Sequence, residues 1–319
     1  MKQIITILIL LASSLTYGQT YKTLVSEADA FYNKKEYKKS VEKYKEAFKL
    51  EQKNGNDFYN AGCSAALSGD KVLALKWLTL ALKNGWSNVR HLKTDTDLTS
   101  LYNNKNWNKL VSEMQEIVDK REAGYDKPLQ AKLLEIYDND QQIRRQYITA
   151  QKEFGHQSKQ VDSLGNIMMY KDSINLIKVT DILDKYGWVG ADKVGGKANQ
   201  TLFLVIQHAD LKTQQKYLPM MREAVKNKNA GNSALALLED RVALGEGRKQ
   251  IYGSQIGYDN ETKKNYVLPL DDPDNVDKRR AAVGLGSLSD YVKHWDIVWN
   301  VEEYKKEQSQ IEEKQKNEK

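Results

Sequence analysis

Apolar and small residues in the first hundred positions repeat at an interval of 34 residues. Large and small side chains follow one another in a similar order in both copies. The matched positions are Leu24/Phe58, Ala28/Gly62, Phe31/Ala65, Ser40/Ala74, Tyr44/Leu78 and Ala47/Ala81. This interval is typical of a helix–turn–helix unit stacked on its next copy, because small residues let helix backbones approach while large ones fill the facing gaps. The pattern predicts helical hairpins over residues 20–122.

These positions resemble those of the tetratricopeptide (TPR) repeat. The resemblance implies a concave helical surface that binds a segment of another protein. Residues 85–117 keep a weaker helical period. They predict a degenerate third unit that helps to close the stack, since two units alone bury too little surface.

A second helical region follows a break at residues 124–128. Apolar residues share one helix face over 129–147, and further helical patterns cover residues 161–186, 198–209, 217–225 and 234–244. Around Gln250 the pattern changes to aromatic and β-branched runs that flank a turn-rich stretch, which predicts a β-hairpin near residues 250–270. Asp272 before Pro273 then predicts a helix N-terminus.

The predicted fold class is therefore mostly α. TPR-like helical hairpins come first, and an α-helical domain with a small β-hairpin follows over residues 126–300. The last segment, residues 301–319, is a mixed-charge tail, expected to be a frayed helix or disordered.

The first 18 residues have the pattern of a secretory signal peptide. Lys2 precedes an apolar run at residues 4–12, and small residues at Thr16 and Gly18 make Gln19 the expected mature start. The apolar run is about half the ~20 residues that a membrane span needs. We expect an exported protein, periplasmic or extracellular, without stable membrane insertion.

The composition argues against several classes of binding site. The formal net charge of +6 is spread over a chain that is 29% charged, so no nucleic-acid binding is expected. Cys63 is the only cysteine, and the four histidines have no zinc-ligand spacing. Neither a metal site nor a cofactor is predicted.

Three charged or polar residues occupy helix positions that the apolar pattern assigns to the core. Asp140 lies in the apolar face of its helix, Arg241 shares a face with leucines, and His208 ends an all-apolar helix. Buried charges persist only when they are paired and hydrogen-bonded. One hypothesis is a polar pocket that binds a ligand or performs acid–base chemistry; the other is an internal salt-bridge network, with Arg241 holding Asp140 or Asp210. The candidate pocket residues are Asp140, Gln141, Arg144, Gln207, His208, Asp210, Asp240, Arg241, Tyr252 and Gln255.

The separated motifs of this region resemble those of an uncharacterised bacterial domain family. They are Asp140-Gln141 with Arg144, residues 207–210, residues 240–242, residues 252–255, and residues 276–280 ahead of Gly284-Leu285. The resemblance covers roughly residues 129–291 and implies a discrete domain of unknown function.

The sequence thus favours an exported TPR-type scaffold that binds a protein or peptide through its repeats. The alternative is an envelope enzyme or small-ligand receptor that uses the polar residues around His208. A binding protein is favoured over an enzyme, and the oligomeric state is left open.

Overall fold

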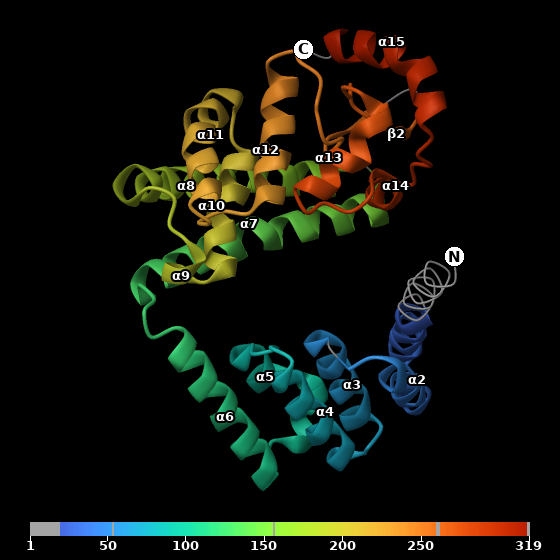
Figure 1. Ribbon diagram of the computed structural model, residues 1–319, viewed down its shortest axis with the longest axis vertical. Helices are drawn as coiled ribbons and strands as arrows, with labels where there is room; N and C mark the ends of the chain where they lie inside the picture. The colour runs from blue at the N-terminus through green and yellow to red at the C-terminus, as the bar shows by residue number, and fades with distance from the viewer. Residues whose placement is uncertain (1–19, 53, 156, 260–261, 318–319) are drawn as a thin grey trace, which may run out of the picture. The chain divides into compact units, whose positions relative to one another are not determined.

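The computed structural model describes residues 20–52, 54–155, 157–259 and 262–317, with side chains as far as Glu313. The predicted signal peptide at residues 1–18 lies outside the described residues. The chain forms two compact units, Met1–Ala123 and Gly124–Lys319 (Figure 1). Both are built mainly from helices, which confirms the predicted fold class. None of the described helices combines the length and hydropathy that a membrane span needs.

The first unit consists of short helices joined by tight turns. Residues 20–33 are helical, and they are followed by α2 (Tyr37–Leu50), α3 (Gly55–Leu67), α4 (Lys71–Lys83), α5 (Val89–Thr94), η1 (Thr96–Leu101) and α6 (Lys105–Arg121). Polar side chains cap the N-termini of several of these helices, where they accept hydrogen bonds from backbone N–H groups of the first turn. Asn54 does so for α3 and Asp70 for α4. The predicted helical hairpins are therefore present.

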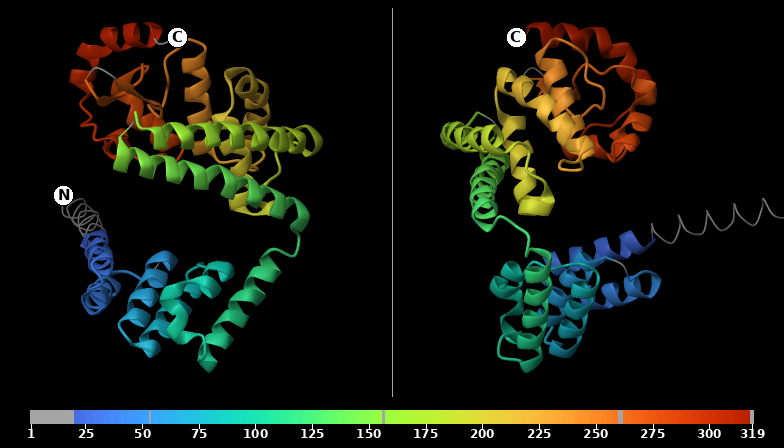
Figure 2. Two further views of the ribbon diagram at one scale, coloured as in Figure 1. Left: turned by 180° about the vertical axis from the view of Figure 1, so that it is seen from behind. Right: turned by 60° about the vertical axis from the view of Figure 1, so that its left-hand side comes forward.

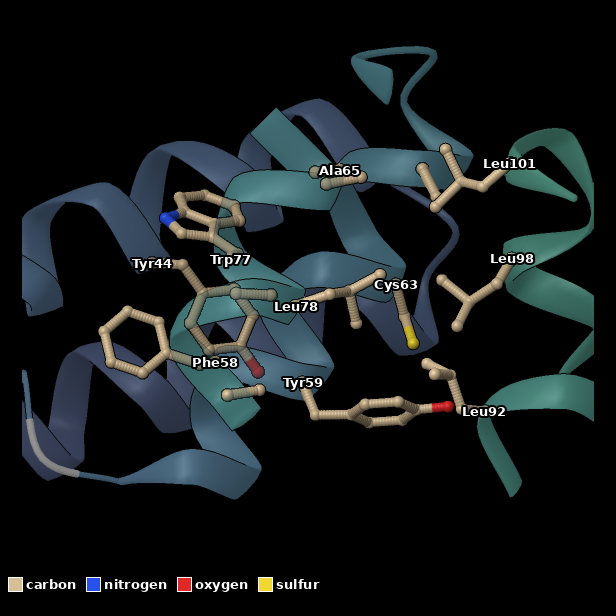
Figure 3. Packing of buried hydrophobic residues seen from close by; sticks show 14 of the residues in the cluster. Tyr44, Phe58, Tyr59, Cys63, Ala65, Trp77, Leu78, Leu92, Leu98 and Leu101 are labelled. Atoms are coloured by element: carbon tan, nitrogen blue, oxygen red, sulfur yellow. The ribbon is translucent and has the colours of Figure 1, made fainter. Parts of the chain in front are cut away.

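Residues of the 34-residue repeat form much of the core of this unit. Tyr44, Phe58 and Leu78 are each at most 1% exposed. A Cβ added at Gly62 of α3 would lie 2.8 Å from the Leu78 side chain of α4, so the small residue is what allows these two helices to approach. Figure 3 shows Leu78 within the cluster that contains Tyr44 and Phe58.

The second unit begins with two long helices joined by a short connection. They lie side by side, as both views in Figure 2 show. The helices are α7 (Lys127–Phe154), α8 (Lys159–Tyr186), α9 (Ala191–Val194), α10 (Gly196–His208), α11 (Leu211–Lys226) and α12 (Asn232–Gly245). The apolar stretch Leu202–Ile206 of α10 is mostly buried, because α7, α8 and α12 all contact this helix.

The rest of the second unit forms a smaller cluster with its own apolar core. Its elements are β1 (Ile256–Asp259), β2 (Lys264–Val267), η2 (Pro273–Asn275), α13 (Val276–Ala282), α14 (Leu288–Val292), η3 (Lys293–Trp295) and α15 (Val301–Asn317). The two strands are antiparallel, with Ile256 opposite Val267. The sheet is shorter than predicted, because residues 250–255 form a loop that side chains hold in place.

The charged tail, expected to be a frayed helix or disordered, forms α15. Tyr304 and Ile311 are each 6% exposed and join the small apolar core. The Tyr304 hydroxyl accepts a 2.6 Å hydrogen bond from the backbone N–H of Leu270. Two apolar side chains on one face, Tyr304 and Ile311, dock the helix onto this core.

Candidate functional site

A buried carboxylate is the centre of the first polar cluster in the second unit. Asp140 on α7 is 1% exposed. Gln141 Nε2 donates to its Oδ2 over 2.7 Å, while Arg144 and His208 approach its Oδ1 to 3.4 and 3.1 Å. Burial raises the pKa of the Asp140 carboxyl, but the His208 hydrogen bond and the Arg144 charge outweigh it and lower the pKa below its usual value. Asp140 is therefore ionised at neutral pH.

His208, the last residue of α10, is oriented from both sides of its ring. Arg144 Nε donates to His208 Nε2 over 3.3 Å, so Nε2 is the acceptor nitrogen. Nδ1 then carries the proton and donates it to Asp140. These proton positions are assigned from the hydrogen-bond network. An aspartate–imidazole pair of this kind fixes the tautomer and the orientation of the ring.

Asp172 of α8 completes this cluster, although it is not among the residues predicted from the sequence. The two terminal nitrogens of Arg144 donate to the two oxygens of Asp172 over 2.9 and 2.8 Å. This bidentate pair, together with the bond to His208, engages all three guanidinium nitrogens. No spacing along the chain marks Asp172, because only the packing of α7 against α8 brings it to Arg144.

A cavity of about 150 Å³ opens beside the first cluster. Its lining residues are Asp140, Asp172, Ser173, Leu176, Val205, His208, Ala209 and Asp210. Asp210 also begins α11, where its carboxylate accepts the Thr213 N–H over 2.8 Å. At ~30 Å³ per water molecule, the cavity has room for a few waters or a small polar group.

Asp240 is the centre of a second polar cluster, and it shapes the loop at residues 250–255. Its carboxylate, 0% exposed, accepts the backbone N–H groups of Ile251, Tyr252 and Ser254 over 2.6, 3.0 and 3.0 Å. Burial raises the pKa of Asp240, and these N–H donors partly offset that effect. The loop therefore depends on one buried carboxylate of α12.

Two further buried side chains hold the same loop. Arg280 of α13, only 1% exposed, donates to the carbonyls of Tyr252 and Gly286 over 2.7 and 2.6 Å, and its guanidinium lies 4.8 Å from the centre of the Tyr291 ring. Gln250 donates to the carbonyls of Gln255 and Leu268. These contacts hold the loop through buried side chains.

Arg241 lies at the edge of the second cluster with its side chain exposed. Its Nε donates to Gln255 Oε1 over 3.1 Å. The predicted pairing of Arg241 with Asp140 or Asp210 is wrong: neither carboxylate lies within ion-pair distance of it, and Asp140 is held by Arg144 instead. Arg241 instead contacts the 250–255 loop through Gln255.

Protein atoms crowd the Arg241 guanidinium although it is exposed. That crowding lowers the pKa of Arg241, and the positive charge of Arg144 lowers it further, whereas Tyr291 acts in the opposite direction. The two clusters are therefore neighbours. The structure places Asp140, Gln141, Arg144, His208 and Asp210 around the first, and Asp240, Arg241, Tyr252 and Gln255 around the second.

Gln207 is the candidate residue that joins neither cluster. It is 6% exposed, and its Nε2 lies 3.5 Å from the carbonyl of Leu237 on α12. Its Oε1 is buried and has no hydrogen-bond partner among the described residues. Although it precedes His208 in the chain, the helical turn points it to the other side of α10.

The first unit contains a groove whose lining residues were not predicted from the sequence. Four tyrosine hydroxyls each donate to an aspartate within it. The pairs are Tyr21–Asp57 at 2.7 Å and Tyr32–Asp97, Tyr44–Asp29 and Tyr59–Asp95 at 2.5 Å. Burial and the paired carboxylate raise the pKa of each tyrosine, so the hydroxyls remain donors.

Two adjoining hollows make up this groove, with volumes of about 760 and 560 Å³. Asp29 lines both of them. The smaller hollow also contains Asp95 and Asp97, and no lysine or arginine is present among the described residues that line it. The potential in the groove is therefore negative.

One part of the groove brings three possible metal ligands together. Ligand atoms of Cys63, Asp95 and Asp97 lie within 4.8 Å of one another. Figure 3 shows Cys63 beside Tyr59. Burial raises the pKa of the Cys63 thiol and opposes the thiolate that a soft metal needs, and the carboxylates already accept tyrosine hydroxyls. This donor set does not favour a metal.

The second unit matches a known family. Residues 127–302 match the model of a family of unknown function, DUF6624. The chain belongs to the DUF6624 family. The match includes both polar clusters, so the resemblance to an uncharacterised domain is confirmed, whereas no family match supports the TPR-like repeats. A search of curated proteins and a search of solved structures each found no match. The family match therefore assigns no activity to this domain.

Proposed function

We propose that the protein is an exported scaffold whose TPR-like first unit binds an extended, positively charged segment of a partner protein. The observation that carries this proposal is the row of four tyrosine–aspartate pairs in one groove. Stacked helical hairpins expose a concave surface of this kind, which suits an extended peptide.

The negative charge of the groove favours a partner segment with positively charged side chains. Aspartates and Glu51 line the two hollows, against the single lysine Lys22 and the imidazole of His91. Each tyrosine hydroxyl occupies one acceptor position of its aspartate, and the remaining lone pairs can accept from lysine or arginine side chains. The tyrosine rings and Trp86 add aromatic faces, on which cationic groups are stabilised.

The proposal is tested with two labelled peptides and the full chain. We expect a fluorescein-labelled peptide of alternating lysine and glycine to bind, and its glutamate–glycine counterpart not to bind. Fluorescence anisotropy measures both affinities. Salt should weaken the binding, since the Debye length falls to ~8 Å at physiological ionic strength.

A charge-only variant makes this test specific to the groove. Asp29→Asn together with Asp97→Asn keeps an oxygen acceptor for each tyrosine and removes two charges. We expect roughly tenfold weaker peptide binding from this variant. Glu113→Gln on α6 is the matched control, because Glu113 lies outside both hollows and pairs with Lys109. Equal affinities in all three proteins would contradict the proposal.

The proposal that the protein is exported rests only on the pattern of the first 18 residues. In a bacterial host we expect the protein to leave the cytoplasm, and the intact mass of the purified product to correspond to a chain that starts at Gln19. A cytoplasmic protein with its initial residues retained would refute export but would leave the groove proposal untouched.

A further inference from the structure

The DUF6624 domain presents an arginine that is oriented but not neutralised. Arg241 uses its Nε to bind Gln255, and its two terminal nitrogens make no hydrogen bond or ion pair with any described residue. By contrast, Arg222 pairs with Glu239 and Arg279 with Asp272 in the same domain. The guanidinium therefore has a fixed Nε and two terminal nitrogens whose N–H donors are unused within the described part of the chain.

The side chain that orients Arg241 is itself held firmly. Gln255 receives a hydrogen bond at its backbone carbonyl from Gln250 Nε2 and donates its backbone N–H to Gln250 Oε1 over 2.8 Å. Its side-chain Nε2 donates to Ser254 Oγ over 2.9 Å, which leaves Oε1 directed at Arg241. The buried carboxylate of Asp240 fixes the loop beneath. This arrangement reduces the conformational entropy that a binding event would cost.

The charges around Arg241 favour a negative ligand. The positive charge of Arg144 acts on Arg241 and lowers its pKa. The two aspartates of the first cluster are already engaged by Arg144 and His208. An anion at Arg241 would relieve the repulsion between the two guanidinium groups.

We infer that Arg241, oriented by Gln255, binds the oxyanion group of a small ligand, either a carboxylate or a phosphate. The planar guanidinium fork matches both groups through two parallel N–H···O bonds, which an ammonium cannot provide. Gln255 is a positioning residue in this site. The inference concerns the second unit and does not depend on the peptide groove of the first.

The experiment is an NMR titration of the full-length protein with inorganic phosphate and, separately, with acetate. Sodium chloride holds the ionic strength constant. The probe is the side-chain amide of Gln255, whose resonance is assigned by its absence in Gln255→Leu. We expect a saturable shift with at least one of the two anions. A shift that stays linear with both anions would overturn the inference.

Variants separate binding from a purely architectural role. Arg241→Gln should weaken anion binding roughly tenfold or more, and Arg241→Lys should not restore it, because the fork is lost. Arg222→Gln removes the same charge from α11 and should bind like the natural protein. The melting temperature of Arg241→Gln should not fall. Unchanged anion affinity in Arg241→Gln, with or without a lower melting temperature, would overturn the inference.

Discussion

Replacing Asp240 by alanine should destabilise the second unit far more than replacing an exposed aspartate. The Asp240 carboxylate accepts three backbone N–H groups, from Ile251, Tyr252 and Ser254. Each buried donor left without an acceptor costs about 1–3 kcal/mol. Some N–H groups will reach water as the loop relaxes, and the cost of burying the carboxylate disappears, so we expect a loss of about 3–5 kcal/mol.

Asp210→Ala is the matched control for this prediction. Asp210 makes one capping bond, to the Thr213 N–H, and its loss should cost about 1 kcal/mol. Hydrogen exchange followed by mass spectrometry measures the two units separately in the full chain. In Asp240→Ala, peptides that cover residues 250–256 should exchange fastest, and peptides of the first unit should not change. Equal losses in the two variants would refute the view that this carboxylate holds the loop.

Two further outcomes follow from the structure. Gly55→Ala should destabilise the first unit by about 1–3 kcal/mol, because the new Cβ would lie 2.7 Å from the backbone oxygen of Asn84; Gly124→Ala, which meets no atom within 4 Å, should be neutral in the same thermal unfolding assay. Because the folded-state pKa of Asp140 is lowered, its ionised form stabilises the fold above the unfolded-state pKa of ~3.9, and this contribution is lost as pH falls through the folded-state value. The free-energy difference between the natural protein and Asp140→Asn should therefore shrink between pH 7 and pH 3 in urea unfolding, and a constant difference would contradict this reasoning.

Helical periodicity was sufficient to predict most of the elements. The 34-residue interval marks residues that are now seen in the core of the first unit, because stacked hairpins need small residues where helices cross. The apolar stretch Leu202–Ile206 correctly indicated a central helix of the second unit. The change of period near Gln250 indicated a hairpin, although the paired strands are only Ile256–Asp259 and Lys264–Val267. The separated motifs also indicated the uncharacterised domain that the family match confirms.

The sequence determined which polar residues stand in apolar faces, and only the tertiary structure decided their partners. Asp140 was predicted to need a cation, and the packing of α7 against α8 and α10 supplied Arg144 and His208. Arg241 looked equivalent by helical position, yet its side chain is exposed and bonds Gln255 of the 250–255 loop. Periodicity reports the direction of a side chain from its own helix axis. Which element lies opposite depends on how helices far apart in the chain pack together, and no spacing within one helix contains that information.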